Sequence, residues 1–512
     1  MAFLQEHLLS IILFSPVIGA LFLLLVPGER KQTIRWLAMV ISLITLGFSL
    51  WLWFGYDASL PGYQFVENAV WYEAIKSSFH LGVDGISVPM VLLTTLLTPL
   101  ALLISFSIEE NVRSYMMLFL LLETGMLGVF LSLDLLLFFV FWEIGLVPMY
   151  FLINQWGSAN RQYASFKFLI YTMAGSLGLL LAIQMIGVAS GTFDLITITE
   201  SWSTLSGPLS ILGLPITLSM TTVKSIAFWA FVVAFAIKVP VWPFHTWLPD
   251  AHTEAPTAGS MILAGVLLKL GAYGFLRLVL PLYPAEAKIF AGALALLATL
   301  AIVLGAFASW GQDDFKRLVA YSSVNHMGFV VLGIAAAAFA NGTMLANDAV
   351  IAINGAVLQM FNHGLSAAGM FLLVGVVYER AHTRDLNELG GLFPLAPIYG
   401  GILIFTAMAS LGLPGLNGFI SEFMVVRGAW PIFTLFTALS MIGLLITGAY
   451  ILKGIAKVLH GPINEKWMGH TMEINRREMI AIIPLMILML WIGVWPAWIL
   501  NVINQTVLRL FG

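Results

Sequence analysis

Long apolar runs separated by short polar segments dominate the chain. An apolar run of about 17–25 residues is long enough to cross the hydrocarbon core of a bilayer as a helix. Fourteen such runs are present, and several exceed this length, which allows tilting or breaks. In chain order they are 8–26, 36–54, 86–108, 115–131, 134–153, 166–187, 223–249, 257–280, 288–308, 317–340, 348–378, 395–428, 431–457 and 479–502. The pattern predicts an all-α polytopic membrane protein with about 14 transmembrane helices.

The distribution of lysine and arginine agrees with this count and predicts an orientation. Fifteen of these residues follow or end odd-numbered spans, six lie on the opposite side, and two, Lys238 and Lys269, lie inside spans. An excess of lysine and arginine marks the cytoplasmic side of a membrane protein. We therefore expect a multi-pass protein of a bacterial inner membrane with both termini on the outer, periplasmic side.

Composition supports the membrane assignment and excludes several kinds of chemistry. Of the 512 residues, 60% are hydrophobic and 10% are charged, whereas soluble domains carry about 25% charged residues. Because the chain has no cysteine, it can hold no thiolate-bound iron–sulfur cluster, cysteine zinc site or disulfide of its own. No phosphate-binding loop, dinucleotide fingerprint or long basic run is present, so nothing indicates a nucleotide or nucleic acid. The longest segments outside the spans, 55–85 and 188–222, are short, and any chemistry is expected within the membrane.

Eight ionisable side chains lie far from the ends of the predicted spans. A charge at the bilayer centre costs at least about 2.5–3.5 kcal/mol, so such residues are functional candidates by default. They are Glu123 in span 4, Glu143 in span 5, Lys238 and His245 in span 7, Lys269 in span 8, His326 in span 10, His363 in span 11 and Glu422 in span 12. Acids, lysines and histidines distributed over this many spans favour a proton relay.

A structural interpretation stays open for several of these residues. A single histidine such as His326 or His363 can be a hydrogen-bonding residue in helix packing, and Glu123 can join two helices. Glu143 and Lys238 can form a static ion pair. Structural charges of this kind explain two or three residues, however, and the larger series favours the relay.

Two spans contain helix-breaking residues next to an ionisable group. In span 7, Pro240 and Pro243 follow Lys238 directly, and each proline removes a backbone donor. In span 12, the segment LGLPGLNG precedes Glu422. Interrupted backbone at this depth is tolerated where it lines a buried cavity, and breaks in corresponding positions indicate internal repeats. We predict two inverted five-helix repeats, spans 4–8 and 9–13, with ordinary proline kinks as the alternative. The predicted parts are 1–110 with spans 1–3, 111–280 as the first repeat, 281–460 as the second, and 461–512 as a cytoplasmic loop and span 14.

Four motifs resemble one known family. They are LLFFVFWEIGLVPMYFLI, AFAIKVPVWPFHTWLPDAHTEAPTAGSMILAGVLLKLGAYGFLR, DDFKRLVAYSSVNHMGF and LGLPGLNGFISEF. The chain resembles, from about residue 80 to residue 430, the antiporter-like M subunits of respiratory complex I, the proton-translocating NADH:quinone oxidoreductase. The resemblance implies fourteen helices, two inverted repeats and no redox cofactor in this chain, with FMN, iron–sulfur clusters and quinone in other subunits. It implies as partners the other membrane-arm subunits, especially two sister antiporter-like subunits, in a lipid bilayer.

The resemblance also implies roles for individual positions of the first repeat. Glu143 is similar to the acid that pairs with the lysine of the broken helix, here Lys238. Lys269 is similar to the central lysine of the eighth helix. His245 matches a histidine toward the connection with that helix.

Positions of the second repeat are assigned in the same way. His326 and His363 lie where the family places histidines that bridge the two half-channels. Glu422 resembles the terminal acid on the second broken helix, where the sister L and N subunits and the D subunit of multisubunit cation/proton antiporters usually carry lysine. The resemblance assigns no role to Glu123.

Together, the residues and the resemblance predict a subunit that moves protons across the membrane, driven by quinone reduction in neighbouring subunits. The alternative is a subunit of a multisubunit sodium/proton antiporter, which the acid at Glu422 and the chain length disfavour. A purely structural membrane subunit is the third possibility, and the charges within the spans disfavour it.

Overall fold

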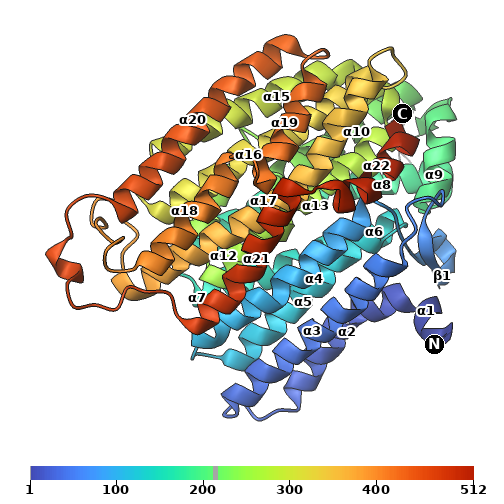
Figure 1. Ribbon diagram of the computed structural model, residues 1–512. Helices are drawn as coiled ribbons and strands as arrows, with labels where there is room; N and C mark the ends of the chain where they lie inside the picture. The colour runs from blue at the N-terminus through green and yellow to red at the C-terminus, as the bar shows by residue number, and fades with distance from the viewer. Residues whose placement is uncertain (1, 211–216, 512) are drawn as a thin grey trace.

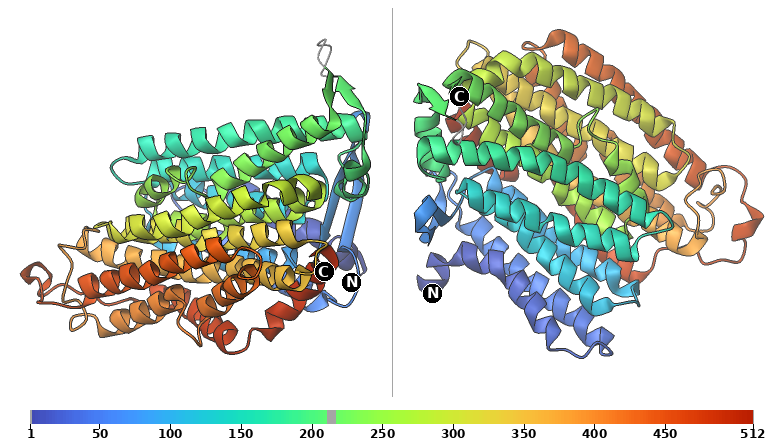
Figure 2. Two further views of the ribbon diagram at one scale, coloured as in Figure 1. Left: turned by 90° about the horizontal axis from the view of Figure 1, so that it is seen from above. Right: turned by 180° about the vertical axis from the view of Figure 1, so that it is seen from behind.

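The protein is a bundle of helices that run side by side between two faces (Figure 1). The computed structural model describes residues 2–210 and 217–511. Both termini, the strands β1 and β2 and helix α9 lie at one end of the bundle, which we name the terminal face (Figures 1 and 2). The long connection between α20 and α21 lies at the other end, which we name the loop face. The predicted class, an all-α polytopic membrane protein, is confirmed.

The elements follow one another as three groups along the chain. The N-terminal group is α1 (Ala2–Glu6), α2 (Leu8–Leu24), α3 (Lys31–Gly55), β1 (Gln64–Tyr72), β2 (Ser77–Val83) and α4 (Ser87–Ile104). The next group is α5 (Val112–Leu131), α6 (Leu135–Ile144), α7 (Leu146–Trp156), α8 (Arg161–Ser190), α9 (Leu195–Ser201), β3 (Pro208–Ser210), β4 (Thr217–Ser219), α10 (Met220–Lys238), α11 (Trp247–Glu254), α12 (Thr257–Ile262), the π-helical η4 (Leu263–Leu267), α13 (Leu268–Gly274), the π-helical η5 (Phe275–Val279) and α14 (Leu280–Leu282). The last group is α15 (Pro284–Trp310), α16 (Phe315–Ala340), α17 (Ala346–Ala381), α18 (Pro397–Leu411), α19 (Asn417–Ala429), α20 (Thr434–Leu459), α21 (Arg476–Val494) and α22 (Ala497–Phe511).

Most of these helices are long and apolar enough to cross a membrane. Within the described residues, twelve helical segments meet that condition, and α2 and α18 are shorter apolar helices. These segments follow the order of the fourteen predicted spans. The exact number of crossings stays a prediction.

Several predicted boundaries change in the structure. Span 14, expected over 479–502, ends as α21 at Val494, and the chain starts a separate helix, α22, after Pro496. Pro496 fixes its own φ and lacks a backbone donor, which favours a new helix start over continuation. The segment 55–85 contains an antiparallel hairpin, β1–β2, because its short strands give no signal on the length scale of a membrane span.

The two halves of the bundle show the same order of elements. The first half runs α5, α6–α7, α8, the broken pair α10–α11 and α12–α14; the second runs α15, α16, α17, the broken pair α18–α19 and α20. In each half the fourth member is interrupted. This order agrees with two repeats, whereas their inversion and the four-part division of the chain stay predictions.

Three elements form the centre of the bundle. Nearly every residue is buried in the α12–α14 segment, in α16 and in α17, while α3, α20 and α21 are much more exposed. Small residues allow the central helices to approach closely: a Cβ added at Gly333 of α16 would lie 2.8 Å from the carbonyl oxygen of Ala352 on α17. The residues Lys269, His326 and His363 therefore belong to helices that are shielded by protein.

Candidate functional site

The first predicted break follows Lys238. Helix α10 ends at that residue, and regular helix resumes only in α11. The carbonyls freed at the break find new donors: the Trp247 indole nitrogen donates to the Ile237 oxygen at 2.8 Å, and the Val241 amide donates to the Ala236 oxygen at 2.7 Å. At least these two backbone carbonyls of the break are thus satisfied inside the protein.

Lys238 lies buried beside an aromatic ring and close to the central helix. It is 2% exposed, and its ammonium nitrogen lies 4.9 Å from the centroid of the Trp142 ring on α6. Its Cβ is adjacent to Gly271 of α13, where an added Cβ would lie 3.0 Å away. The base of the side chain therefore packs against the helix that carries Lys269, while its ammonium group lies over Trp142 of α6.

Glu143 is the electrostatic neighbour of Lys238, although the two form no direct ion pair in the described part of the chain. Its Oε1 is buried without a hydrogen-bond partner. The next residue, Ile144, is 36% exposed, and Val147 is 50% exposed, so Glu143 lies near a face of the isolated chain. In this structure the Glu143 carboxylate and the Lys238 ammonium group are therefore not in direct contact.

Lys269 lies between a π-helical turn and α17. It is fully buried, and its Nζ donates to the Ala264 carbonyl oxygen in η4 at 2.5 Å. The same nitrogen is 2.7 Å from Nδ1 of His363 on α17. π-Helical turns inside α-helices occur frequently at functional sites, and here the turn supplies a carbonyl that holds the lysine against the histidine.

Two histidines, His363 and His326, lie between Lys269 and the acid Glu422. The rings of His363 and His326 have centroids 5.7 Å apart. Nδ1 of His326, on α16, lies 2.6 Å from Oε1 of Glu422 on α19. Lys269, His363, His326 and Glu422 therefore form a buried series, which we name the four-residue line, across four helical segments of the bundle.

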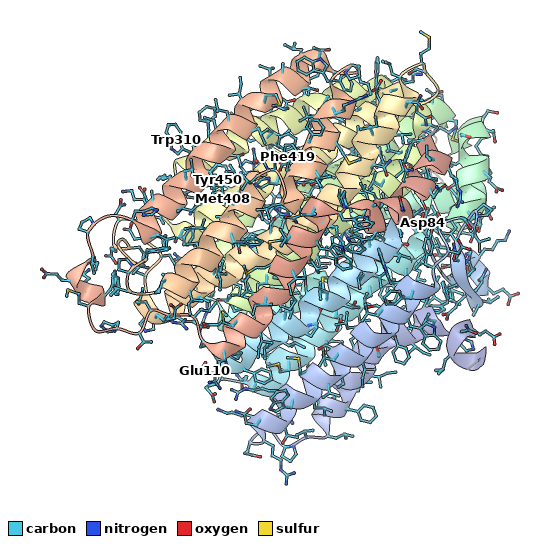
Figure 3. The ribbon with its side chains drawn as sticks, in the orientation of Figure 1. Asp84, Glu110, Trp310, Met408, Phe419 and Tyr450 are labelled. Carbon is cyan, nitrogen blue, oxygen red and sulfur yellow. The ribbon has the colours of Figure 1, made fainter. Side chains whose placement is uncertain are left out.

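Neutral polar side chains support the end of this line. The Gln359 amide donates to Glu422 Oε1 at 2.9 Å, and the Tyr450 hydroxyl lies 3.3 Å from His326 Nε2. The hydroxyl of Ser421 donates to Gln359 Oε1 at 2.5 Å. Tyr450, labelled in Figure 3, is fully buried on α20. The sequence analysis missed these three partners, because neutral polar residues within a span carry no charge signal.

The second predicted break lies directly before Glu422. Gly412 and Gly415, with φ of +84° and +94°, turn the chain between α18 and α19, a conformation that glycine adopts without steric penalty. The Asn362 side-chain amide stabilises the backbone at this break by donating a hydrogen bond to the Asn417 carbonyl oxygen at 2.7 Å. No side chain caps the first turn of α19, and Oε1 of Glu422 bonds His326 and Gln359. A helix-capping role for this acid is therefore not supported.

Four of the eight candidate residues lie outside the line: Glu143 and Lys238, described above, and Glu123 and His245. Glu123 is fully buried on α5 beside Thr98. His245 lies in the first break, with its ring 6.0 Å from that of Tyr321. Within the described residues, no hydrogen bond joins Glu123, Glu143 or His245 to the four-residue line.

His252 is a buried ionisable residue that the sequence analysis missed. It is fully buried on α11, its ring stacks on Phe371 at 4.3 Å, and neither ring nitrogen has a hydrogen-bond partner. Lys316 and Lys269 are its nearby cationic residues. The predicted end of span 7 at residue 249 placed it outside the membrane helices, although its position seven residues after His245 was a usable signal.

A cavity of about 250 Å³ lies at the loop face, next to the C-terminal end of α11, the helix that carries His252. Its lining includes Glu254, Lys316, Tyr378 and Glu379. Lys316 is 6% exposed and donates to the Ala255 carbonyl oxygen. The cavity is thus a polar recess whose lining includes the buried Lys316.

Comparison with known proteins places the chain among membrane subunits of respiratory complexes. Residues 132–447 match the family described as NADH:quinone oxidoreductase/Mrp antiporter, transmembrane. NADH-quinone oxidoreductase subunit M of Rhodobacter capsulatus is 39% identical, over 99% of this chain and 96% of the relative. NADH-ubiquinone oxidoreductase chain 4 of Marchantia polymorpha is 37% identical, over 98% of this chain and 96% of the relative.

Solved structures agree with these relatives. A chain of respiratory complex I from Thermus thermophilus with bound NADH superposes with a TM-score of 0.84 at 27% identity, covering 98% of this chain and all (100%) of that chain. A chain of the Mrp complex from Dietzia sp. DQ12-45-1b gives a TM-score of 0.83 at 18% identity, covering 99% of this chain and 98% of that one. At that identity the second likeness establishes the shared fold alone.

Proposed function

Since the chain belongs to the NADH:quinone oxidoreductase/Mrp antiporter family and is similar over nearly its whole length to subunit M relatives, we propose that it is a proton-translocating membrane-arm subunit of an NADH:quinone oxidoreductase. The observation that carries the proposal is the four-residue line. It connects the centre of the bundle to the second broken helix through titratable groups. A series of acids, lysines and histidines inside a membrane bundle is typical of a proton relay.

Two of the three proton transfers along the line use contacts already within hydrogen-bond reach. Lys269 Nζ lies 2.7 Å from His363 Nδ1, and His326 Nδ1 lies 2.6 Å from Glu422 Oε1. General acid–base transfer needs a distance of about 2.6–3.2 Å between the heavy atoms. Between the two histidines, with ring centroids 5.7 Å apart, transfer requires ring reorientation or one bridging water. The cavity with Lys316 and then His252 form the uptake side, and Glu422 is the terminal proton acceptor.

Rearrangement of Glu143 and Lys238 provides the control of this transfer. When Glu143 is near, it offsets the charge of Lys238; when it withdraws, that charge acts on Lys269 and favours release of its proton to His363. Two like charges about 10 Å apart interact by roughly 1.7 kcal/mol at an effective dielectric of about 20. Moving one charge against 100 mV requires about 2.3 kcal/mol, so the two effects are of the same order.

The remaining parts of the reaction belong to other subunits. In this proposal FMN, iron–sulfur clusters and quinone are held by neighbouring chains, and sister antiporter-like subunits flank this one in the membrane arm. The loop face is cytoplasmic and the terminal face is periplasmic in a bacterial inner membrane, following the excess of lysine and arginine at the loop face.

Purification of the tagged chain from its native membrane tests the assignment to a complex. We expect it to co-purify with flavin- and iron–sulfur-containing subunits and with NADH:quinone reductase activity. A complex without flavin that exchanges sodium for protons would instead support the antiporter alternative and contradict the proposal.

Glu143→Gln is expected to reduce quinone reduction and proton pumping together by at least about tenfold, equivalent to ~1.4 kcal/mol of lost coupling. The amide keeps the shape of the side chain but removes the charge that offsets Lys238. The measurements are NADH oxidation and acidification of inverted vesicles containing the assembled complex. Glu143→Asp should retain more activity, and the exposed Glu29→Gln serves as the control. Parental pumping by the Gln variant would remove Glu143 from the mechanism.

A further inference from the structure

A buried ion pair, outside the four-residue line, involves an arginine on the same central segment as Lys269. Arg277 of η5 and Asp84, just before α4, are 3% and 4% exposed. The Arg277 Nη2 atom donates to Asp84 Oδ1 at 2.6 Å. The same oxygen accepts from the amides of Ile86 at 3.0 Å and Ser87 at 3.1 Å. The carboxylate is therefore held in place by several donors.

Two tyrosines complete the enclosure of the guanidinium. Arg277 Nε donates to the Tyr273 hydroxyl at 3.1 Å, and Nη1 donates to the Tyr63 hydroxyl at 2.8 Å. The guanidinium carbon is 5.2 Å from the centroid of each ring. The Tyr273 hydroxyl in turn donates to the Phe130 carbonyl at 3.0 Å. We name Arg277, Asp84, Tyr63 and Tyr273 the Arg277 cluster.

The cluster lies between Lys269 and the terminal face. Arg277 follows Lys269 by two helical turns, a rise of about 12 Å, along the segment that runs toward the terminal face. In Figure 3, Asp84 lies toward that face, far from Glu110 near the loop face. Helix α22 covers the position: the Gly85 amide donates to Thr506 Oγ1 at 2.9 Å, and a Cβ added at Gly85 would lie 2.0 Å from the Val502 carbonyl oxygen.

We propose that the Arg277 cluster is a seal that prevents protons from passing directly between Lys269 and the terminal face. This inference rests on the proposed proton-translocating function. A pump requires that its central carrier exchange protons with one side at a time, and a direct path from Lys269 to the terminal face would bypass His363, His326 and Glu422. An arginine cannot relay protons, because it stays protonated in proteins. Fixed guanidinium charges also exclude protons and cations from other membrane pores.

The alternative is a purely structural cluster that ties α4, η5 and α22 together, and passive proton leakage distinguishes the two. The test uses the purified complex in liposomes without NADH, under an imposed potassium diffusion potential, with a pH-sensitive dye inside. The double variant Asp84→Asn with Arg277→Gln removes both charges together, so that neither is left buried and unpaired. We expect about a tenfold faster proton leak with NADH:quinone reductase activity retained.

Two further variants identify the route of the leak. Adding Lys269→Met to the double variant should return the leak to the parental rate, because the bypass runs through Lys269. Arg427→Gln is the matched control: Arg427 pairs with Asp348 at 2.9 Å near the same face, but its side chain is 52% exposed. This variant should remain proton-tight.

The seal is overturned if the assembled double variant is as proton-tight as the parent, or if its leak persists after Lys269→Met. It is also overturned if neither the double variant nor Tyr63→Phe, which loses a single hydrogen bond, yields an assembled complex, because the cluster would then serve assembly. A parental complex that oxidises NADH without pumping would refute the proposed function instead, and the leak comparison distinguishes that outcome.

Discussion

Lys269→Ala is expected to abolish NADH-driven acidification of membrane vesicles, by roughly a hundredfold or more, while the complex still assembles. General acid–base groups contribute about 10²–10⁴-fold to the steps they serve, and in the proposed mechanism this lysine is the proton carrier at the start of the four-residue line. Its ammonium group makes the contacts with Ala264 and His363, so the alanine variant leaves His363 without a proton donor. Acidification is measured in inverted vesicles with NADH as fuel.

Lys269→Arg separates a carrier from a fixed charge. Arginine keeps the positive charge but does not release its proton, and the buried site between η4 and α17 is fitted to an ammonium group. We therefore expect the arginine variant to be impaired nearly as strongly as the alanine variant. Lys288 is exposed at the surface of the bundle, and Lys288→Ala is the control for the loss of a lysine side chain. Pumping by Lys269→Arg at the parental rate would show that Lys269 acts only as an electrostatic fixture.

The order of the helices could be predicted because a helix must have a minimum length to cross the membrane. Each apolar run that crosses the bundle is long enough to be recognised without its neighbours. Both breaks could also be predicted, since Pro240 and Pro243 in one span and Gly412 and Gly415 in the other act on the local backbone. The hairpin β1–β2 could not, because its strands are short and its pairing depends on contacts across a turn.

The candidate residues could be identified by charge, but their contacts could not. Lys269 and His363 are separated by 94 positions along the chain, and His326 and Glu422 by 96. Only the packing of α13, α16, α17 and α19 brings them within hydrogen-bond distance. The sequence alone does not show that these two pairs are in contact, nor that Glu143 and Lys238 form no direct ion pair in the described structure.

Residues that support a charge are the hardest to find from sequence alone. Gln359 and Tyr450 carry no charge and occur in apolar helices, where their hydrogen-bonding partners lie on other segments. His252 was ionisable but lay beyond a predicted boundary, and the boundaries of helices are the least certain part of such predictions. The structure supplies these partners because it fixes which faces of the helices meet.

Glu422→Gln is expected to yield an assembled complex whose proton pumping falls by roughly a hundredfold. The amide oxygen of glutamine can still accept the hydrogen bonds that His326 and Gln359 donate to Oε1, so the packing of α16, α17 and α19 persists. The variant loses the carboxylate that, in the proposed mechanism, accepts the proton at the end of the line.

Substitutions of different chemistry at the same position test this role of Glu422 further. Glu422→Ala should lose at least as much activity as the Gln variant, because it removes both the titratable group and the hydrogen bonds to α16 and α17. Glu422→Lys should retain partial function, since a lysine beside His326 still offers a group that binds and releases a proton. The exposed Glu465→Gln is the matched control. If vesicles with Glu422→Gln acidify at the parental rate with NADH as fuel, Glu422 is a packing residue, and the line ends at His326.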